Sequence, residues 1–364
     1  MKDVRAPYMH WAKQHRRARW DLCGSNLLPC TLEDLPEAAE AMQLNGPNDE
    51  GYPPLVEAIA RRYGVDAGRV AMGTGTSGAN FLVCAALLDA GDDVLVETPG
   101  YDPLVAAPTL LGARVLRFAR RFEDLFALDP ALVARAVTDR TRLIIITNLH
   151  NPSGVLASQA AIEEVGRIAE RVGAHVLVDE VYLDATFGSP DASRCPAGTL
   201  GGVFISTSSL TKAYGLSGFR CGWSLSSPEV AERVRRARDI VDGVGAFPPD
   251  RFSVVAFEHL PRLAARAHSI LEPQFAATRE FLDSRPEFEY VAPAGGTVVF
   301  PRLRGQADAG LLVERLFREA EVGVVPGRFF EAPAHVRLAF GGAGETVRGG
   351  LEAMGTWFER RAGL

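Results

Sequence analysis

Short apolar runs alternate with amphipathic stretches along the first two thirds of the chain. The runs have the length of buried strands, and they lie at 70–72, 93–97, 113–118, 143–147, 175–178 and 203–206, with 221–225 as a further candidate strand. Apolar residues at helical spacing predict helices at 54–63, 104–111, 158–171 and 228–242. A further helix is expected to open with the glycine-rich segment TGTSGA and to run to Leu88. This alternation predicts an α/β fold with a mostly parallel sheet that carries helices on both faces.

The pattern changes after residue 242. The segment 243–249, which reads Gly-Val-Gly-Ala-Phe-Pro-Pro, interrupts it, and a long helical stretch follows. Short strands are then expected at 298–300, 322–326 and 335–340, which is typical of a smaller α+β domain. We therefore expect three parts: an arm over 1–44 that also contributes to the small domain, a large domain over 45–245 and a small domain over 246–364.

Composition and charge exclude several classes of protein. The chain has 364 residues, of which 47% are hydrophobic and 23% charged, so it can bury a large core and is not disordered. Its net charge of −6 argues against a dedicated nucleic-acid binder. The N-terminal segment lacks an apolar signal-peptide core, and no apolar run is long enough to cross a membrane, so we expect a cytoplasmic protein.

The five cysteines are scattered and form no Cys-x-x-Cys pair. They are typical of reduced thiols rather than of a disulfide framework or a metal site. Lysine is unusually scarce, because only Lys2, Lys13 and Lys212 stand among 39 basic residues. Lysine can lose its proton and act as a nucleophile, whereas arginine cannot. The isolated Lys212 is therefore a candidate for chemistry.

Four polar or glycine-rich segments follow predicted strands, where ligands bind in open α/β sheets. They are Gly73–Ala79 (GTGTSGA), Pro99–Tyr101 (PGY), Asn151–Gly154 (NPSG) together with Asp179–Tyr182 (DEVY), and Ser208–Arg220 (SSLTKAYGLSGFR). Each segment alone has an ordinary explanation, such as a helix cap or a loop tyrosine. Together they supply a phosphate cradle, an aromatic ring for stacking, a carboxylate, a phenol and an imine-forming lysine. These are the groups that a pyridoxal 5′-phosphate site requires.

The sequence resembles the class I/II aminotransferases of the pyridoxal phosphate fold type I superfamily. The resemblance runs from about residue 45 to 340, and GTSGA, PGY, NPSG, DEVY, SLTKAYGLSGFRCGW and VRLAFG carry it in order. It implies a homodimer that acts on an amino acid and a 2-oxo acid. It also implies that Lys212 forms the internal aldimine and that Asp179 pairs with the pyridine nitrogen. The other implied cofactor contacts are Tyr101 stacked on the ring, Tyr182 and Asn151 at the ring oxygen, and Gly75, Thr76, Ser77, Ser209 and Arg220 at the phosphate.

For the substrate, the resemblance implies that Arg337 of VRLAFG clamps the α-carboxylate, since a planar guanidinium binds a carboxylate through two hydrogen bonds. Asn151 and Ser25 are further candidates for substrate contacts. Relatives specific for dicarboxylates carry an arginine where this chain has Asp242, and an aspartate there would suit a cationic side chain such as that of arginine. The ordinary alternative is that Asp242 is a solvated residue at a helix end.

One other position departs from the family pattern. Where relatives usually have a tyrosine that reaches the neighbouring subunit's phosphate, this chain has Gly46. Either Asn45 or Asn48 replaces that tyrosine, or the phosphate lacks the ligand.

We expect an amino-transfer reaction in which Lys212 moves the substrate α-proton. Lyases, cyclases and decarboxylases of this fold share the same cofactor residues and stay open as alternatives. One is a cyclase that acts on a hydroxyarginine, such as capreomycidine synthase. A pyridoxal phosphate-binding regulator is disfavoured, because no helix-turn-helix pattern precedes the core. A dinucleotide-dependent reductase is disfavoured as well, because no Gly-x-Gly-x-x-Gly follows the early strand.

Overall fold

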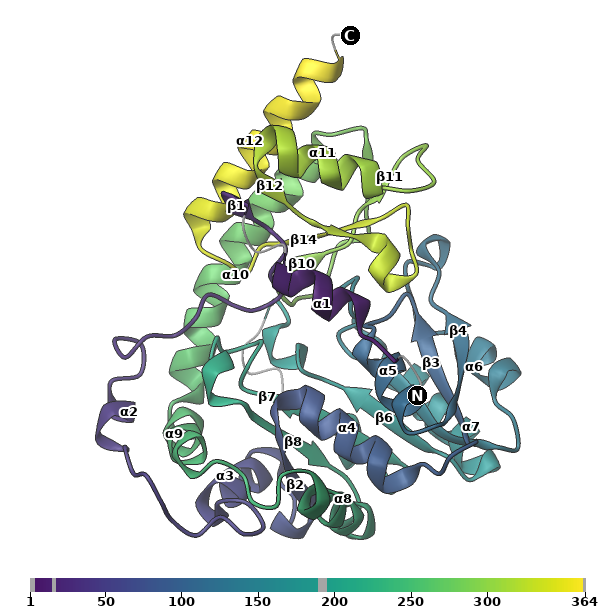
Figure 1. Ribbon diagram of the computed structural model, residues 1–364, viewed down its shortest axis with the longest axis vertical. Helices are drawn as coiled ribbons and strands as arrows, with labels where there is room; N and C mark the ends of the chain where they lie inside the picture. Colours follow the sequence, from purple (N-terminus) through teal and green to yellow (C-terminus); the bar gives the residue numbers. More distant parts are fainter. Residues whose placement is uncertain (1–3, 15–17, 189–194, 363–364) are drawn as a thin grey trace.

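The computed structural model describes residues 4–14, 18–188 and 195–362, and Figure 1 shows their arrangement. Its larger sheet has seven strands in the order β2-β8-β7-β6-β5-β3-β4. In that order, the strands are Val70–Thr74, Cys221–Leu225, Phe204–Ser209, His175–Asp179, Thr141–Thr147, Asp93–Thr98 and Arg114–Ala119. The mixed α/β class that the sequence predicts is therefore confirmed.

Strand directions decide where the loops of this sheet gather. Strand β3 pairs parallel with β4 and β5, and the parallel pairing continues through β6 to β7. Strand β8 is antiparallel to both of its neighbours, β7 and β2. The carboxyl ends of β2, β3, β5, β6 and β7 thus share one edge of the sheet, and β8 begins at this same edge.

Both faces of the sheet are covered by helices, which explains why the predicted strands read as continuous apolar runs. On β5, Leu143 and Ile145 pack with the helices α4, α5 and α8, whereas Ile144 and Ile146 pack with α6 and α7. These helices are Gly75–Leu87 (α4), Pro103–Leu110 (α5), Pro130–Ala136 (α6), Gln159–Val172 (α7) and Pro228–Val241 (α8).

The upper part of the molecule in Figure 1 is built mainly from the C-terminal third of the chain. Its helices are Leu260–Asp283 (α10), Gly310–Ala320 (α11) and Gly344–Ala362 (α12), and its strands are Phe288–Glu289 (β9), Val298–Val299 (β10), Arg302–Leu303 (β11), Val322–Gly323 (β12), Val325–Pro326 (β13) and Val336–Ala339 (β14). Strand β14 lies between β10 and β13, and β9 pairs with β11. From the N-terminal arm, Trp20–Asp21 (β1) pairs parallel with β12. The exact domain limits at 44/45 and 245/246 stay a prediction.

Two features differ from the simple pattern. The segment 243–249, which we expected to separate two parts of the chain, also contains the start of a helix, Phe247–Glu258 (α9). Pro248 and Pro249 lie in the first turn of this helix, where proline is tolerated. Five helices among the described residues do not follow from the hydrophobic pattern: Pro7–Gln14 (α1), Glu37–Glu40 (α2), α6, α11 and α12. The helix expected at 54–63 is confirmed as Pro53–Tyr63 (α3).

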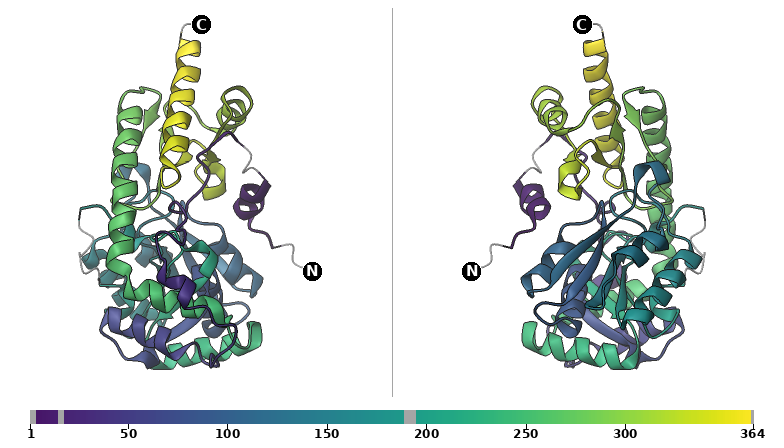
Figure 2. Two further views of the ribbon diagram at one scale, coloured as in Figure 1. Left: turned by 90° about the vertical axis from the view of Figure 1, so that its left-hand side faces the viewer. Right: turned by 90° about the vertical axis from the view of Figure 1, so that its right-hand side faces the viewer.

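Helix α1 occupies a distinctive place. It crosses the middle of the molecule between the upper part and the large sheet, and it stands at one side in the turned views (Figure 1, Figure 2). In the part of the chain that the structure describes, no helix combines the length and the apolar character needed to span a bilayer.

Candidate active site

A cavity of about 220 Å³ lies at the carboxyl edge of the large sheet. It brings together side chains from segments that are far apart in the sequence, because the strand ends meet at this edge. Among the residues predicted from the sequence, its lining contains Ser25, Thr76, Ser77, Tyr101, Asn151, Asp179, Tyr182, Ser209, Lys212 and Arg220.

Lys212 lies in the loop between β7 and β8 and extends its amine into the cavity. Its Nζ donates hydrogen bonds to Ser25 Oγ at 2.8 Å and to Asn26 Oδ1 at 2.6 Å. Both partners come from the N-terminal arm. The arm therefore holds the amine in place, and Ser25 lies beside the predicted reactive group.

Asp179 ends strand β6 and is buried. Its carboxylate accepts hydrogen bonds from Asn80 Nδ2 at 2.8 Å and from the backbone N–H of Val181 at 3.2 Å. Thr207 holds Asn80 in turn through a hydrogen bond of 2.6 Å. Burial raises the pKa of Asp179 to about 6, although the Asn80 bond and the charge of Lys212 oppose this shift. A cationic ligand at this carboxylate would relieve the cost of its burial.

The phenol and amide predicted at the ring oxygen also face the cavity. Tyr182 Oη donates to the carbonyl oxygen of Ser25 at 3.0 Å, and burial raises the pKa of Tyr182 to about 12, so the phenol keeps its proton at neutral pH. Asn151 is positioned by its backbone N–H, which donates to Thr147 Oγ1 at 2.8 Å. Glu97 accepts in turn from the Thr147 backbone N–H at 2.7 Å. Buried groups beneath the cavity therefore fix the position of Asn151.

The predicted phosphate cradle has a shape that suits a phosphate and contains hydrogen-bond donors without a partner among the described residues. Gly75 has φ +66°, and a Cβ at this position would collide with the guanidinium of Arg220. The hydroxyls of Thr76 and Thr211 are buried and have no hydrogen-bond partner among the described residues. Helix α4 begins here, and its N-cap residue Thr74 makes no side-chain capping bond. An anion at this helix N-terminus would satisfy these groups.

Arg220 supplies the positive charge of the cradle. Its Nη2 donates to the carbonyl oxygen of Thr74 at 3.3 Å, and no carboxylate of the described residues lies within ion-pair distance. Ser209 accepts a hydrogen bond from the backbone N–H of Thr211 at 3.3 Å, and Ser77 is exposed at the rim. The residues present thus fit a phosphorylated pyridine cofactor.

Two predicted substrate residues do not line this cavity. Arg337, on β14, is buried behind it, with Nη1 at 3.5 Å from Asn151 Oδ1. Asp242 ends helix α8, where its carboxylate lies 3.6 Å from Arg238 Nε. Arg337 is thus adjacent to the predicted substrate position, whereas Asp242 is outside the cavity of its own chain.

The structure also shows the surroundings of Gly46, which stands where relatives usually have a tyrosine. A Cβ at Gly46 would collide with the ring of Phe247. Asn48 is buried and donates to the carbonyl oxygen of Gly245 at 3.0 Å, whereas Asn45 is exposed. Of the two amides that could replace the tyrosine, Asn45 is therefore the one that faces outward.

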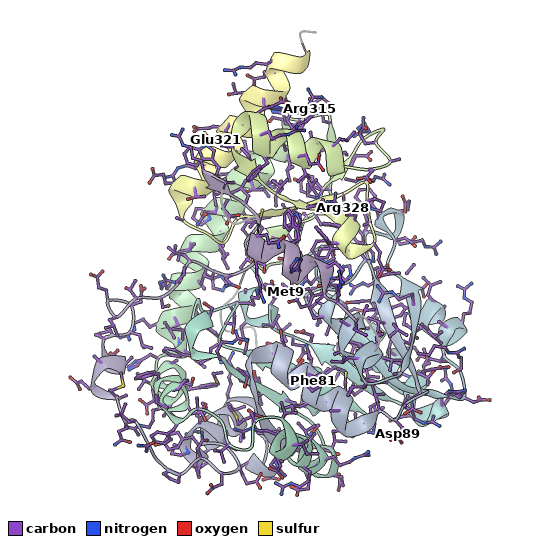
Figure 3. The ribbon with its side chains drawn as sticks, in the orientation of Figure 1. Met9, Phe81, Asp89, Arg315, Glu321 and Arg328 are labelled. Carbon is purple, nitrogen blue, oxygen red and sulfur yellow. The ribbon has the colours of Figure 1, made fainter. Side chains whose placement is uncertain are left out.

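Sequence reasoning missed Asn26, Asn80, Thr147 and Met9, which hold or line the site. Asn80 could have been found, because it is the polar residue within the apolar run 79–87 of helix α4. Met9, which Figure 3 labels, lies on α1 above the sheet edge, and no local pattern indicates its role.

Comparison with known proteins agrees with this geometry. The family described as aminotransferase class I and II matches residues 21–354. The chain belongs to this family. Its members use pyridoxal 5′-phosphate, which is therefore the cofactor of this enzyme. The resemblance seen in the sequence is confirmed.

Individual aminotransferase-family proteins align along most of the chain. Capreomycidine synthase of Streptomyces vinaceus is 31% identical, over 96% of this chain and 92% of its own length. Arginine–pyruvate transaminase of Pseudomonas aeruginosa is 27% identical, over 81% of this chain and 76% of its own length. A crystal structure of a PLP-dependent aminotransferase from Streptococcus suis superimposes with a TM-score of 0.91 and 28% identity, covering 99% of both chains.

Proposed function

We propose that this family member is an aminotransferase that moves an amino group between an amino acid and a 2-oxo acid. The observation that carries the proposal is the position of Lys212, whose amine shares one cavity with the buried carboxylate of Asp179 and with the phosphate cradle. When bound, pyridoxal phosphate supplies an aldehyde that condenses with amines and a ring that stabilises negative charge at the substrate α-carbon.

The side chains of the cavity would bind the cofactor and move the substrate proton. Asp179 would hold a proton on the ring nitrogen, and Tyr182 would donate a hydrogen bond to the ring oxygen. Arg220, Thr76 and Thr211 would bind the phosphate. Lys212 Nζ would take the proton from the substrate α-carbon and deliver it to the cofactor carbon.

For the substrate, we propose an amino acid with a cationic side chain, of the arginine type, whose α-carboxylate binds Arg337 and approaches Asn151. Two of the relatives support this class of substrate. The name of one contains arginine, and the other is the capreomycidine synthase at 31% identity, an example of the hydroxyarginine cyclases considered above. Asp242 lies outside the cavity of its own chain, so it would meet the substrate's cationic end only from a second copy in a homodimer.

The second candidate is a cyclase or lyase that uses the same cofactor residues. The capreomycidine synthase relative favours it, because that similarity extends over 96% of this chain. The cavity residues serve both reactions equally, since both begin with removal of the α-proton.

The deciding experiment omits the amino acceptor. The cofactor-loaded protein is mixed with arginine, a β-hydroxyarginine whose hydroxyl can leave as water, ornithine, aspartate, glutamate or an aromatic amino acid, and the products are quantified by mass spectrometry. We expect arginine to give one equivalent of its 2-oxo acid per active site, and Lys212→Ala to give none. Formation of a cyclic product or of pyruvate, without that 2-oxo acid, would replace the proposal by the second candidate.

A further inference from the structure

The guanidinium of Arg337 is a buried cation with an incomplete set of partners. Its exposed fraction is 1%, and its Nε has no hydrogen-bond partner among the described residues. Nη2 donates to the Tyr8 hydroxyl and, at 3.4 Å, to the carbonyl oxygen of Cys23. In the described part of the chain, no carboxylate lies within 4.0 Å of it. A buried charge in this state is costly, so the site is suited to an anion.

The side chain that covers this cation is Tyr8 of helix α1. The guanidinium carbon of Arg337 lies 4.8 Å from the centre of the Tyr8 ring and 4.8 Å from the centre of the Phe330 ring. Nε and Nη2 form one of the edges of the guanidinium that can bind a carboxylate through two parallel hydrogen bonds. The Tyr8 hydroxyl occupies one donor of that edge and leaves the other unmet.

Helix α1 is held at this place by the segment that carries Tyr101. The backbone N–H of Tyr8 donates to Asp102 Oδ2 at 2.8 Å, so Asp102 caps the first turn of α1 from another part of the chain. Tyr101 Oη donates to Met9 Sδ at 3.1 Å. A helix of eight residues is marginal on its own, so its position depends on such contacts.

We propose that the Tyr8 hydroxyl is a placeholder for the substrate α-carboxylate at Arg337, and that α1 is released from the guanidinium when the carboxylate binds. A carboxylate satisfies both Nε and Nη2, whereas a neutral phenol satisfies one donor, so the exchange favours the substrate. The Tyr8 hydroxyl thus competes with the substrate carboxylate for the Arg337 guanidinium. This inference rests on the proposed function, since it takes Arg337 as the carboxylate site.

The test uses carboxylates that cannot react with the cofactor because they lack an amino group. The probes are 5-guanidinopentanoate, which is arginine without its α-amino group, and hexanoate. Their dissociation constants for the cofactor-loaded enzyme are measured by calorimetry. We expect Tyr8→Phe to bind both probes about five- to tenfold more tightly, because one competing hydrogen bond is removed while the ring is kept.

A matched control is Tyr52→Phe. The Tyr52 hydroxyl also accepts a hydrogen bond from an arginine, Arg251, at 2.8 Å, but Tyr52 does not line the cavity. This variant should leave both dissociation constants unchanged. Hydrogen exchange of the wild-type enzyme gives a second measurement, in which saturating probe should speed the exchange of the α1 amides, including that of Tyr8.

Weaker binding by Tyr8→Phe, or slower exchange in α1, would overturn the proposal and make Tyr8 a direct ligand of the substrate. An unchanged affinity would reduce Tyr8 to a packing residue. Arg337→Gln separates this result from the proposed function. If Arg337→Gln retains full affinity for both probes, the proposed carboxylate site itself is wrong, whereas loss of affinity leaves that site intact whatever Tyr8 does.

Discussion

At the scale of single residues, Asp179 shows how strongly the cavity depends on its ligand. The side chain is 6% exposed, and its hydrogen-bond donors are an amide side chain and a backbone N–H. Burial of a carboxylate favours the protonated form, which is why its pKa is raised from 3.8 to about 6. In the cofactor-free chain this residue therefore costs stability at neutral pH.

The destabilisation of the folded, cofactor-free protein by Asp179 can be measured as a function of pH. As the pH rises above the ordinary carboxyl pKa, the unfolded chain loses the Asp179 proton first, so the folded state is destabilised until the pH exceeds its own pKa. Between about pH 5 and about pH 7.5, the cofactor-free protein should lose about 1.4 kcal/mol of unfolding free energy relative to Asp179→Asn.

Urea unfolding of both cofactor-free proteins across this pH range gives the difference. Since Asn keeps the shape of the side chain, other titrating groups cancel in the comparison. Parallel pH profiles for the two proteins would contradict the raised pKa. With cofactor bound, the difference should become smaller, because a protonated ring nitrogen favours the ionised carboxylate.

Local sequence could predict the cavity residues that follow strands, but not those that other parts of the chain bring in. Lys212, Asp179 and Tyr182 stand in motifs directly after apolar runs, so their meeting at one sheet edge was predictable. Asn26 and Tyr8 reach the site from the N-terminal arm, whose path depends on long-range packing. The spacing of apolar residues within the arm does not predict this path.

At the scale of elements, the strands of the large sheet were predictable because both of their faces are buried. The expected run 143–147 lies within Thr141–Thr147, and 175–178 lies within His175–Asp179. Two-residue strands such as β1 and β9 have no such signal, because their partners define them. Helix α1 was missed for a related reason, since Asp102 of a distant segment caps its first turn.

The start of helix α4 allows a direct test of the phosphate cradle. Gly75→Ala would place a methyl group against Arg220 at a backbone conformation that disfavours a side chain. We expect about tenfold weaker binding of pyridoxal phosphate, measured by fluorescence titration of the cofactor-free protein.

Gly68→Ala is the matched control, because a Cβ there meets nothing within 4 Å and the backbone is not left-handed. It should bind the cofactor as the wild type does. Equal affinity of the Gly75 and Gly68 variants would show that the cradle tolerates a side chain and that Arg220 can move aside.

At the scale of the whole molecule, an apolar surface lies where two distant segments meet. Gly46 approaches Phe247, and in the chain segments that lead to these two residues Leu44 is 75% exposed and Ile240 is 87% exposed. Val241 and Val244 are exposed there as well. Several large apolar side chains left exposed in two segments that meet are typical of a protein interface. We expect this surface to join two copies into the proposed homodimer.

Light scattering after size-exclusion chromatography tests this expectation. The wild type should be a dimer, and Ile240→Asp should shift it toward monomer, because a charge would be buried in the interface. Leu311→Asp is the control, since Leu311 is 75% exposed on α11. A dimer that survives Ile240→Asp but dissociates on Leu311→Asp would place the interface on the upper part of the molecule instead.

The antiparallel direction of β8 limits how much the length of the connection between β7 and β8 can vary. Since β7 ends and β8 begins at the same edge of the sheet, one short connection delivers both Lys212 and Arg220 to the cavity. The proposed attachment point for the aldehyde and the proposed counter-charge for the phosphate are thus linked by eight positions of chain. An insertion or deletion in this connection would alter the distance between the two ends of the bound cofactor, so its length is constrained by the size of that molecule.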